Sequence, residues 1–269
     1  MKIDLHMHTS RSDGRWSPQK LAAEATKRRL MAWAITDHDT IAAWRELAPQ
    51  PGLLCGVEIS TWDERGEIHV VALGIDPDHA ELTAALANNV AIRRERAQVL
   101  LDHVAAKTGQ RVTLDDCLPA EAGMITRSHI ASALVRAGVV AYRQQAFNEL
   151  IGDASVQQLY QPAYPSPAEA GELIRAAGGV SVLAHPGLYG DIHRIEGVMR
   201  GLDGIEVKHP NLDVGLQKLL MKQAAENNWL LSCGSDFHSD PCRLGDWRLS
   251  RSQAMPLLRA AGWQDPVRA

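Results

Sequence analysis

Two histidines one residue apart stand near the start of the chain, within the stretch MKIDLHMHTSRSDG. Side chains alternate along a β-strand, so His6 and His8 would project from one face at the strand end, where two imidazoles can bind one metal ion. An isolated pair of this kind is more often a chance pair on a surface strand. The choice between a metal site and a chance pair therefore depends on the rest of the chain.

Other histidines and carboxylates fall at the ends of predicted strands or in the loops that follow them. These residues are Asp13, Asp37, His38, Asp39, Glu58, His69, His185, His209, Asp236 and His238, while His129 begins a predicted helix. Each alone could make a turn, cap a helix or form a surface hydrogen bond. Together they favour a multinuclear site for divalent cations, because imidazole suits zinc, iron and manganese and carboxylates bridge hard cations.

Short β-like runs must position these side chains. They cover residues 2–8, 31–39, 53–60, 67–75, 179–186, 204–209 and 229–238. Amphipathic helical stretches separate several of the runs, and two of these helices begin with a Ser-Pro pair, at Ser17 and Ser166, that is typical of an N-cap followed by the first helical residue. Alternating strands and helices predict an α/β fold with a parallel sheet or barrel, in which active sites gather at the carboxyl ends of the strands. The length of 269 residues is close to that of one α/β barrel.

Residues 77–165 differ from the rest of the chain because helical patterns dominate there. We predict that this segment is a helical insertion subdomain, carried by a barrel that comprises residues 1–76 and 166–269. Its first long helix contains Arg93, Arg94, Glu95 and Arg96, a run typical of a solvated helix face with local ion pairs. A substrate-facing arginine is the alternative.

Composition narrows the possible partners and the compartment. The net charge of −4 and the pI near 6.3 argue against electrostatic capture of long nucleic acid, but a small anionic substrate stays open because bound cations can supply positive charge. No apolar run is long enough to span a membrane, so no membrane partner is expected. The first residues lack a signal-peptide pattern, and the cysteines lack CxxC spacing, so we expect a cytoplasmic protein with reduced thiols. The four cysteines are Cys55, Cys117, Cys233 and Cys242.

Seven short motifs follow one another along the chain: HMHTSRSDG, ITDHDT, GVEIS, EIHVVALGI, RSHIA, LAHPG and GSDFH. In this order they resemble the motif series of the PHP (polymerase and histidinol phosphatase) family of the amidohydrolase superfamily, from residue 2 to about residue 240. The chain length and the helical segment make the protein similar to the small bacterial PHP phosphoesterases. In that group, hydrolysis of nucleoside 3′,5′-bisphosphates to 5′-monophosphates and 5′-to-3′ trimming of short RNA are known.

The resemblance implies a distorted (β/α)7 barrel with three divalent metal ions, for which manganese is favoured and zinc or iron are alternatives. The implied ligand sets are His6, His8, Glu58 and Asp236 for one ion, Glu58, His69 and His129 for a second, and Asp13, His38 and His238 for a third. Glu67 lies on the same predicted strand face as His69 and could compete with it as a ligand.

The expected reaction is hydrolysis of the 3′-phosphate of a nucleoside 3′,5′-bisphosphate, with a metal-activated water as nucleophile and short RNA as a second substrate. His209 or His185 could donate a proton to the leaving 3′-oxygen, and Asp236 is the ligand on which activity should depend. The candidate substrate-binding residues are Arg127, Lys208, Arg243 and His185. For the three cationic residues, a surface salt bridge is an equal alternative.

Two other functions stay open. A histidinol-phosphate phosphatase would hydrolyse an amino-alcohol phosphate about as readily as a nucleotide, and a catalytically silent scaffold would bind metal without turnover. In the C-terminal segment, Trp247 and Trp263 could stack on a base, but core or edge packing is favoured for both.

Overall fold

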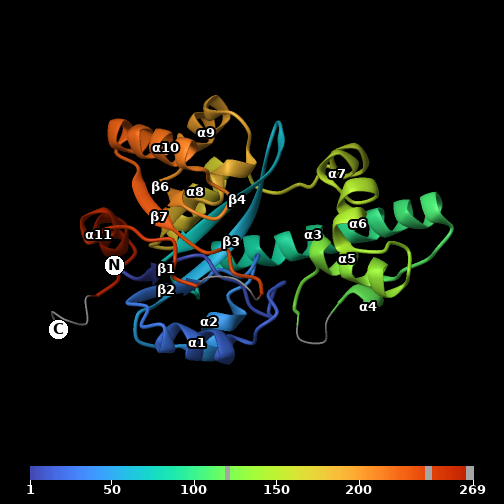
Figure 1. Ribbon diagram of the computed structural model, residues 1–269, viewed down its shortest axis with the longest axis horizontal. Helices are drawn as coiled ribbons and strands as arrows, with labels where there is room; N and C mark the ends of the chain where they lie inside the picture. Colours follow the sequence, from blue (N-terminus) through green and yellow to red (C-terminus); the bar gives the residue numbers. More distant parts are fainter. Residues whose placement is uncertain (119–121, 240–243, 265–269) are drawn as a thin grey trace.

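The computed structural model describes residues 1–118, 122–239 and 244–264. Within these ranges, seven strands form one sheet in the order in which they occur along the chain. They are β1 (Ile3–Asp4), β2 (Ala32–Ile35), β3 (Leu53–Asp63), β4 (Gly66–Leu73), β5 (Val180–Leu183), β6 (Gly204–Lys208) and β7 (Leu230–Cys233). The sheet curves into a nearly closed barrel surrounded by helices (Figure 1), which confirms the distorted (β/α)7 fold.

The residues after β1 and β7 bring the two edges of the sheet together. Leu5 N donates a hydrogen bond to Cys233 O over 3.1 Å, and His8 N donates to Phe237 O over 2.8 Å. In return, Asp236 N donates to His6 O over 2.9 Å. The first and last strands of the barrel are therefore neighbours.

The distortion of the barrel comes from β4, which runs antiparallel to both β3 and β5. Only Glu64 and Arg65 separate β3 from β4, and two residues are too few for a helical crossover, so the chain makes a hairpin instead. The hairpin projects from the barrel wall toward the group of helices that lies beside the barrel (Figure 1). Every other strand pair in the described sheet is parallel.

Six helices cover the barrel. They are α1 (Pro18–Lys27), α2 (Ala42–Leu47), α8 (Pro167–Ala176), α9 (Ile192–Met199), α10 (Val214–Asn227) and α11 (Arg251–Ala260), with a 3-10 turn, η1 (Pro186–Leu188). The two Ser-Pro helix starts are confirmed: Ser17 accepts a hydrogen bond from Lys20 N, and Ser166 forms a capping box with Glu169. Among the described helices, none combines the length and the apolar character that a membrane crossing requires.

The hydrophobic core lies between the strands and the inner faces of these helices. Five strand residues are at most 1% exposed, as expected for strands that are covered on both faces: Val57, Ile59, Val70, Val182 and Ile205. Trp263 is also buried in this core and Trp247 packs against it, which confirms packing as their role. Within the described residues, three cysteines are free and buried (Cys55, Cys117 and Cys233), while Cys242 lies outside the described residues.

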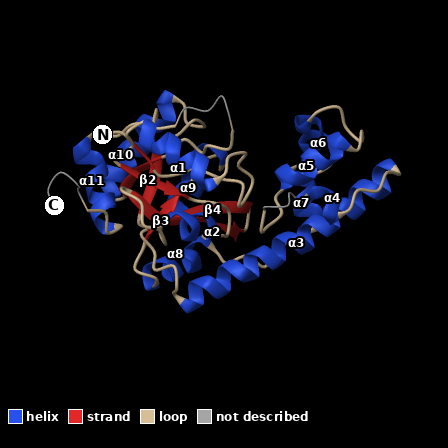
Figure 2. Cartoon of the chain, turned by 90° about the horizontal axis from the view of Figure 1, so that it is seen from below, coloured by secondary structure: helices blue, strands red, loops and turns tan. Residues whose placement is uncertain are grey.

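Five helices make a separate lobe beside the barrel. They are α3 (Ala80–Thr108), α4 (Leu114–Cys117), α5 (Arg127–Arg136), α6 (Arg143–Glu149) and α7 (Asp153–Leu159). Leu100, Leu101, Ile130 and Leu134 are central to a second hydrophobic cluster there. Figure 2 shows α3 passing along the barrel and continuing into the lobe. The helical character of this region agrees with the expectation, while its division from the barrel at residues 77 and 165 stays a prediction.

The expectation of a solvated arginine cluster on α3 is wrong for two of its members. Arg93 and Arg96 are each only 3% exposed, because they lie on the face of α3 that meets the barrel and its β3–β4 hairpin, where they bind Asp39 and Glu67. Arg94 and Glu95, on the other side of the helix, are exposed as expected.

Candidate metal centre

The predicted ligands meet at one end of the barrel, at the carboxyl ends of the parallel strands. His6 and His8 follow β1 and alternate with Leu5 and Met7, and all four side chains are essentially fully buried. The strand alternation therefore directs both imidazoles to the same side, as the sequence predicted. Contributions from β2, β3, β4 and β7 meet them there.

Four donor atoms form the tightest group. His6 Nε2 and His8 Nε2 are 3.1 Å apart, and they lie 3.4 and 3.3 Å from Glu58 Oε2. Asp236 Oδ1 lies 3.6 Å from His6 Nε2 and 3.3 Å from His8 Nε2. Ligands that surround one ion tetrahedrally at about 2.0–2.2 Å are separated by about 3.3–3.6 Å. His6 and His8, together with either carboxylate, therefore have about the spacing that a single divalent ion requires.

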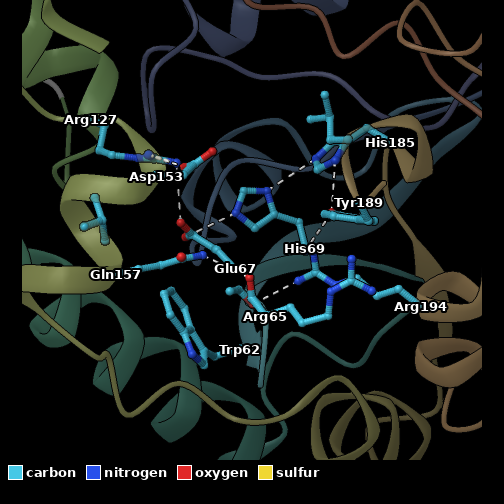
Figure 3. A pocket seen from close by; sticks show the side chains of 13 residues that line it. Trp62, Arg65, Glu67, His69, Arg127, Asp153, Gln157, His185, Tyr189 and Arg194 are labelled. Carbon is cyan, nitrogen blue, oxygen red and sulfur yellow. Dashed lines mark hydrogen bonds and ion pairs between the residues drawn. The ribbon is translucent and has the colours of Figure 1, made fainter. Parts of the chain in front are cut away.

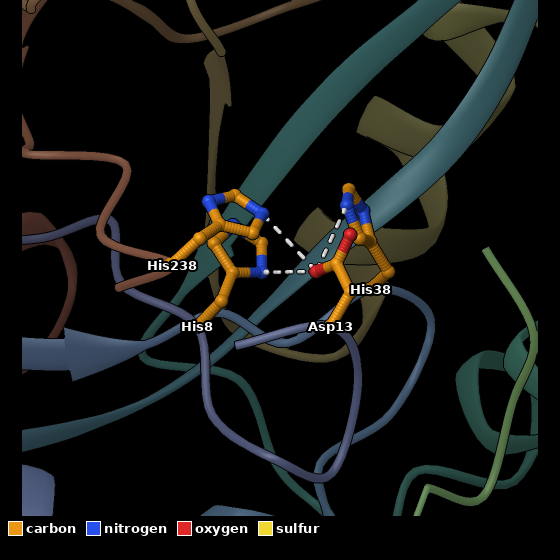
Figure 4. A group of neighbouring side chains, drawn as sticks. All are labelled: His8, Asp13, His38 and His238. Carbon is orange, nitrogen blue, oxygen red and sulfur yellow. Dashed lines mark ion pairs between the residues drawn. The ribbon is translucent and has the colours of Figure 1, made fainter. Parts of the chain in front are cut away.

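A second group lies beside the first and is drawn in Figure 4. Asp13 Oδ1 is 3.1 Å from His238 Nε2, 3.8 Å from His38 Nε2 and 3.9 Å from His8 Nδ1. The structure thus brings together the three residues of one predicted ligand set and adds His8, whose other ring nitrogen belongs to the first group.

Glu58 lies between the groups. Its Oε1 is 2.8 Å from His185 Nε2 and 3.0 Å from His69 Nδ1, and its Oε2 is 3.0 Å from His38 Nδ1. The Glu58 side chain is 1% exposed. A single buried carboxylate with imidazoles around both oxygens can bridge cations.

His129 and His209 depart from the expected grouping. His129 begins α5, where its Nδ1 accepts a hydrogen bond from Thr126 N over 3.2 Å, and it belongs to none of the ligand groups found within the described residues. His209 instead joins His6 and Asp236, with its Nε2 3.7 Å from Asp236 Oδ2.

Several buried polar atoms at this end of the barrel have no hydrogen-bond partner within the described part of the chain. They are Asp13 Oδ1, His38 Nδ1, Glu58 Oε2, His69 Nε2 and His209 Nε2. Buried polar atoms are normally hydrogen-bonded, because an unpaired one costs about 1–3 kcal/mol. Divalent cations would satisfy these atoms, so the donor set fits metal ions.

The carboxylates of the site are anionic. Burial raises the pKa of Glu58, but the surrounding imidazoles, His38 first, lower it further, and the pKa lies well below its usual range. The pKa of Asp13 is raised by burial and lowered more strongly by His238, with the same net result. The pKa of Asp236 is also well below its usual range, because His6 and the neighbouring imidazoles lower it more than burial raises it. Three negative charges in a buried cluster attract cations.

The imidazoles differ among themselves. Burial lowers the pKa of His38 to about 4 despite Glu58 nearby, so His38 is neutral and offers a lone pair. Burial also opposes the charge on His238, but Asp13 raises its pKa to about 10. Glu58 similarly raises the pKa of His69 to about 9 against the effect of burial. Metal binding at these two histidines would therefore release protons.

Two positioning residues escaped the sequence analysis. Glu206, in the middle of β6, binds His6 Nδ1 through Oε1 over 3.0 Å and accepts His185 N at Oε2 over 2.6 Å. A carboxylate that binds the second ring nitrogen of a histidine orients the first toward a metal. Tyr189 OH lies 3.0 Å from His185 Nδ1. The signal for Glu206 was a charged residue inside an otherwise apolar strand, whereas nothing in the sequence marked Tyr189.

Glu67 contacts His69 but also has other partners. Its Oε1 lies 3.3 Å from His69 Nε2, and its Oε2 accepts a hydrogen bond from Arg96 Nη1 over 2.9 Å. Arg127 Nη2 is 3.7 Å from the same oxygen. Glu67 therefore links His69 to two arginines.

A cavity of about 260 Å³ opens beside the metal centre (Figure 3). His69 belongs to both, His185 joins the cavity to Glu58 of the centre, and Arg65, Arg127 and Arg194 line the cavity. Of the predicted substrate-binding residues, Arg127 and His185 are thus brought together. Lys208 instead donates to Gln217 Oε1 over 2.8 Å and is absent from the described lining, and Arg243 lies outside the described residues.

Comparison with known proteins places this geometry in a family. The PHP domain model matches residues 4–210. A 5′-3′ exoribonuclease of Haemophilus influenzae is 35% identical over 90% of this chain and 91% of that protein. A 3′,5′-nucleoside bisphosphate phosphatase of Chromobacterium violaceum is 32% identical over 88% of this chain and 87% of that protein. A Bifidobacterium adolescentis structure assigned as a metal-dependent phosphoesterase superposes with a TM-score of 0.84, at 31% identity, over 99% of this chain and 98% of that one.

The match of the family model covers most of the chain, and the relatives are covered over nearly their whole length. The motif order read from the sequence, the nearly closed seven-stranded barrel and the cluster of histidines and carboxylates agree with this result. The chain belongs to the PHP domain family.

Proposed function

We propose that this protein is a metal-dependent phosphoesterase that removes the 3′-phosphate of nucleoside 3′,5′-bisphosphates and leaves the 5′-monophosphate. The observation that carries the proposal is a cluster of metal donors that shares His69 with an arginine-lined cavity and contacts a second lining residue, His185, through Glu58. A phosphoryl group at the cluster would have its charge balanced by cations, while the rest of an anionic substrate lies among guanidinium groups. The name of the Chromobacterium violaceum relative supports this substrate.

The donor set favours three divalent ions, with manganese preferred and zinc or iron as alternatives. One would be held by His6, His8, Glu58 and Asp236, and another by Asp13, His38 and His238. The third would be held by Glu58 and His69, while His129 lies outside the donor groups of the described residues. When bound, such ions activate water and neutralise phosphoryl charge.

His185 is the best-placed residue to hold a proton for the leaving 3′-oxygen. With both ring nitrogens protonated, His185 can donate its Nδ1 proton to Tyr189 OH, 3.0 Å away, which also accepts a hydrogen bond from His69 N. The Nε2 proton, beside Glu58 and at the edge of the cavity, can then pass to the leaving 3′-oxygen and leave a neutral imidazole. His209 is a weaker candidate because its Nε2 lies among possible metal ligands.

The arginines of the cavity would bind the phosphate that does not react. Arg127 is paired with Asp153, Arg65 with Asp191 and Arg194 with Asp63. A guanidinium carries five N–H donors, so an arginine that binds one carboxylate keeps donors for a phosphate oxygen. The ion pairs also hold the three side chains in place before substrate arrives.

A second candidate function is 5′-3′ exonuclease activity on short RNA, which the name of the Haemophilus influenzae relative favours. Both reactions act on phosphate at the 3′-oxygen of a nucleotide that also has a 5′-phosphate. In the phosphatase reaction the phosphoryl group that is removed is a single phosphate. In the exonuclease reaction it carries the rest of the RNA chain. A net charge of −4 favours small substrates over long ones.

The test is phosphate release by the manganese-loaded protein from adenosine 3′,5′-bisphosphate, histidinol phosphate and 5′-AMP. We expect release from the bisphosphate, its loss in Asp236→Asn, and its retention in the control Asp102→Asn, which changes a carboxylate on α3 far from the cluster. A preference for histidinol phosphate would overturn the substrate assignment. Failure on all substrates with metal bound would overturn the enzyme assignment, and release of 5′-mononucleotides from short RNA alone would favour the exonuclease.

A further inference from the structure

We propose that Trp62 is the stacking platform for the base of the substrate, so that the cavity beside the metal centre accepts one nucleoside of any base. This inference rests on the proposed function, because it assigns the part of the substrate that does not react. Trp62 lines the cavity and lies across it from His185 (Figure 3).

The hairpin places Trp62 on the same side as the metal ligands. Along β3, Glu58, Ser60 and Trp62 alternate with residues of the opposite face. Directly across the hairpin, Ser60 is paired with His69 and Trp62 with Glu67. Residues that oppose each other in an antiparallel pair point to the same face, so one surface leads from the metal centre out to the indole.

The length of this surface suits a nucleotide. Trp62 is four residues after Glu58 along the strand, which corresponds to about 13 Å. A ligand whose phosphate is bound at the metal centre must also contain a sugar and a base ring to contact the indole. A simple sugar phosphate is too short to do so. The strand is held in place there, because Trp62 N donates to Pro165 O over 3.0 Å.

The surroundings of Trp62 favour a planar ring as the occupant. Val156 on α7 and Leu188 on η1 supply apolar surface, and Leu188 is 61% exposed at the cavity. Indole and aliphatic surfaces bind bases by stacking, which every base can do because every base has a π-face. Among the described lining residues, Gln157 alone has a side-chain amide, and its Nε2 already donates to Arg65 O over 2.9 Å. We therefore expect little discrimination among bases.

Contacts between the lobe and the hairpin border the cavity. The Gln157–Arg65 hydrogen bond joins α7 to the hairpin turn, and Arg127 Nη2 on α5 lies 3.7 Å from Glu67 Oε2 on β4. With about 260 Å³, the cavity is just below the range of about 300–1,000 Å³ typical of pockets for larger ligands. Its size therefore favours a small occupant such as one nucleoside over a longer chain.

The experiment compares Trp62→Ala and Trp62→Phe with Trp44→Ala, a control that removes a partly buried tryptophan on α2, away from the cavity. KM is measured for adenosine 3′,5′-bisphosphate and for 1-deoxyribose 3,5-bisphosphate, which lacks a base. Stacking contributes about 1–3 kcal/mol per base, so Trp62→Ala should reduce the preference for the nucleotide over the base-free analogue by about 5- to 150-fold. Trp62→Phe should retain most of the preference, and Trp44→Ala all of it.

A preference that is unchanged in Trp62→Ala would overturn the proposal, as would a KM that rises equally for both compounds. Calorimetric binding of 5′-AMP, uridine 5′-monophosphate and ribose 5-phosphate separates this proposal from the proposed function, because it needs no turnover. Weaker binding of both nucleotides to Trp62→Ala, with ribose 5-phosphate unaffected, supports the platform even if no bisphosphate is hydrolysed. Equal nucleotide binding by the wild type and Trp62→Ala would overturn it.

Discussion

Replacing Arg93 by methionine is expected to lower the free energy of unfolding by about 3–4 kcal/mol. Arg93 Nε binds Asp39 Oδ2 over 2.7 Å, and the two side chains are 3% and 0% exposed. Arg93 also donates to Ser60 Oγ, so its guanidinium joins α3 to β3 and to the loop that carries His38. Methionine keeps much of the side-chain volume but leaves the Asp39 carboxylate without its counter-charge.

The magnitude follows from what remains around Asp39. Removing one partner of a buried ion pair costs about 3–5 kcal/mol. Asp39 keeps hydrogen bonds from Ser60 N, Ser60 Oγ and Asn89 Nδ2, at 2.9, 2.7 and 2.8 Å, which favours the lower part of that range. A loss of this size should lower Tm by roughly 6–16 °C for a chain of this length.

The assay is urea unfolding followed by circular dichroism, with Arg94→Met as the matched control, since Arg94 is the exposed neighbour on the same helix. The control should change the free energy of unfolding by less than about 0.5 kcal/mol. The double variant Arg93→Met/Asp39→Asn should regain part of the loss because no charge is left unpaired. Equal stability of Arg93→Met and Arg94→Met would refute the reasoning.

The same ion pair gives a pH dependence with a defined sign. Burial raises the pKa of Asp39, but Arg93 and the hydrogen-bond donors lower it below its usual value of 3.8. A group whose folded pKa is depressed stabilises the protein above its unfolded pKa, and this stabilisation is lost as the pH falls through the folded pKa. Without Arg93, burial dominates and Asp39 takes up a proton more readily. The stability gap between wild type and Arg93→Met should therefore narrow from neutral pH toward pH 4.

Two further predictions concern the metal centre. Glu206→Gln should weaken manganese binding about 10- to 100-fold, because the carboxylate that orients His6 loses its charge. The affinity is measured by competition with a chelator. Unchanged affinity in a folded variant would contradict the role assigned to Glu206. Manganese at a concentration 100-fold above its Kd should stabilise the chelator-treated protein by about 2.7 kcal/mol, seen as a rise in Tm, and Asp236→Asn should reduce the rise; equal rises in both proteins would count against the ligand set.

The sequence was informative where local periodicity decides geometry. Strand alternation was enough to put His6 and His8 on one side, and parallel strands were enough to bring Glu58, Asp236 and His238 to the same end of the barrel. The antiparallel direction of β4 could also have been predicted, because the two residues between β3 and β4 are too few for the crossover that parallel strands require.

The remaining features depend on tertiary packing that periodicity does not encode. Arg93 was expected in solvent because a run of charged residues does not reveal which face of a long helix will meet another element. Glu206 was overlooked because its partners, His6 and His185, are remote in sequence. Trp62 was missed because it lies on a hairpin that projects from the barrel wall and lines a cavity together with residues of the lobe. Neither feature can be recognised from local sequence periodicity.

The closure of the barrel by its first and last strands has a consequence for folding during synthesis. Asp236, whose amide donates a hydrogen bond to His6 O, is made 230 residues after His6. At about 5–20 residues per second, roughly 10 to 50 seconds separate the two. During that interval the first strand has no partner on one edge, and the tightest donor group does not yet exist. A metal ion bound by that group could therefore enter it only after Asp236 has been made, so ion binding would follow the formation of most of the barrel and would not nucleate it.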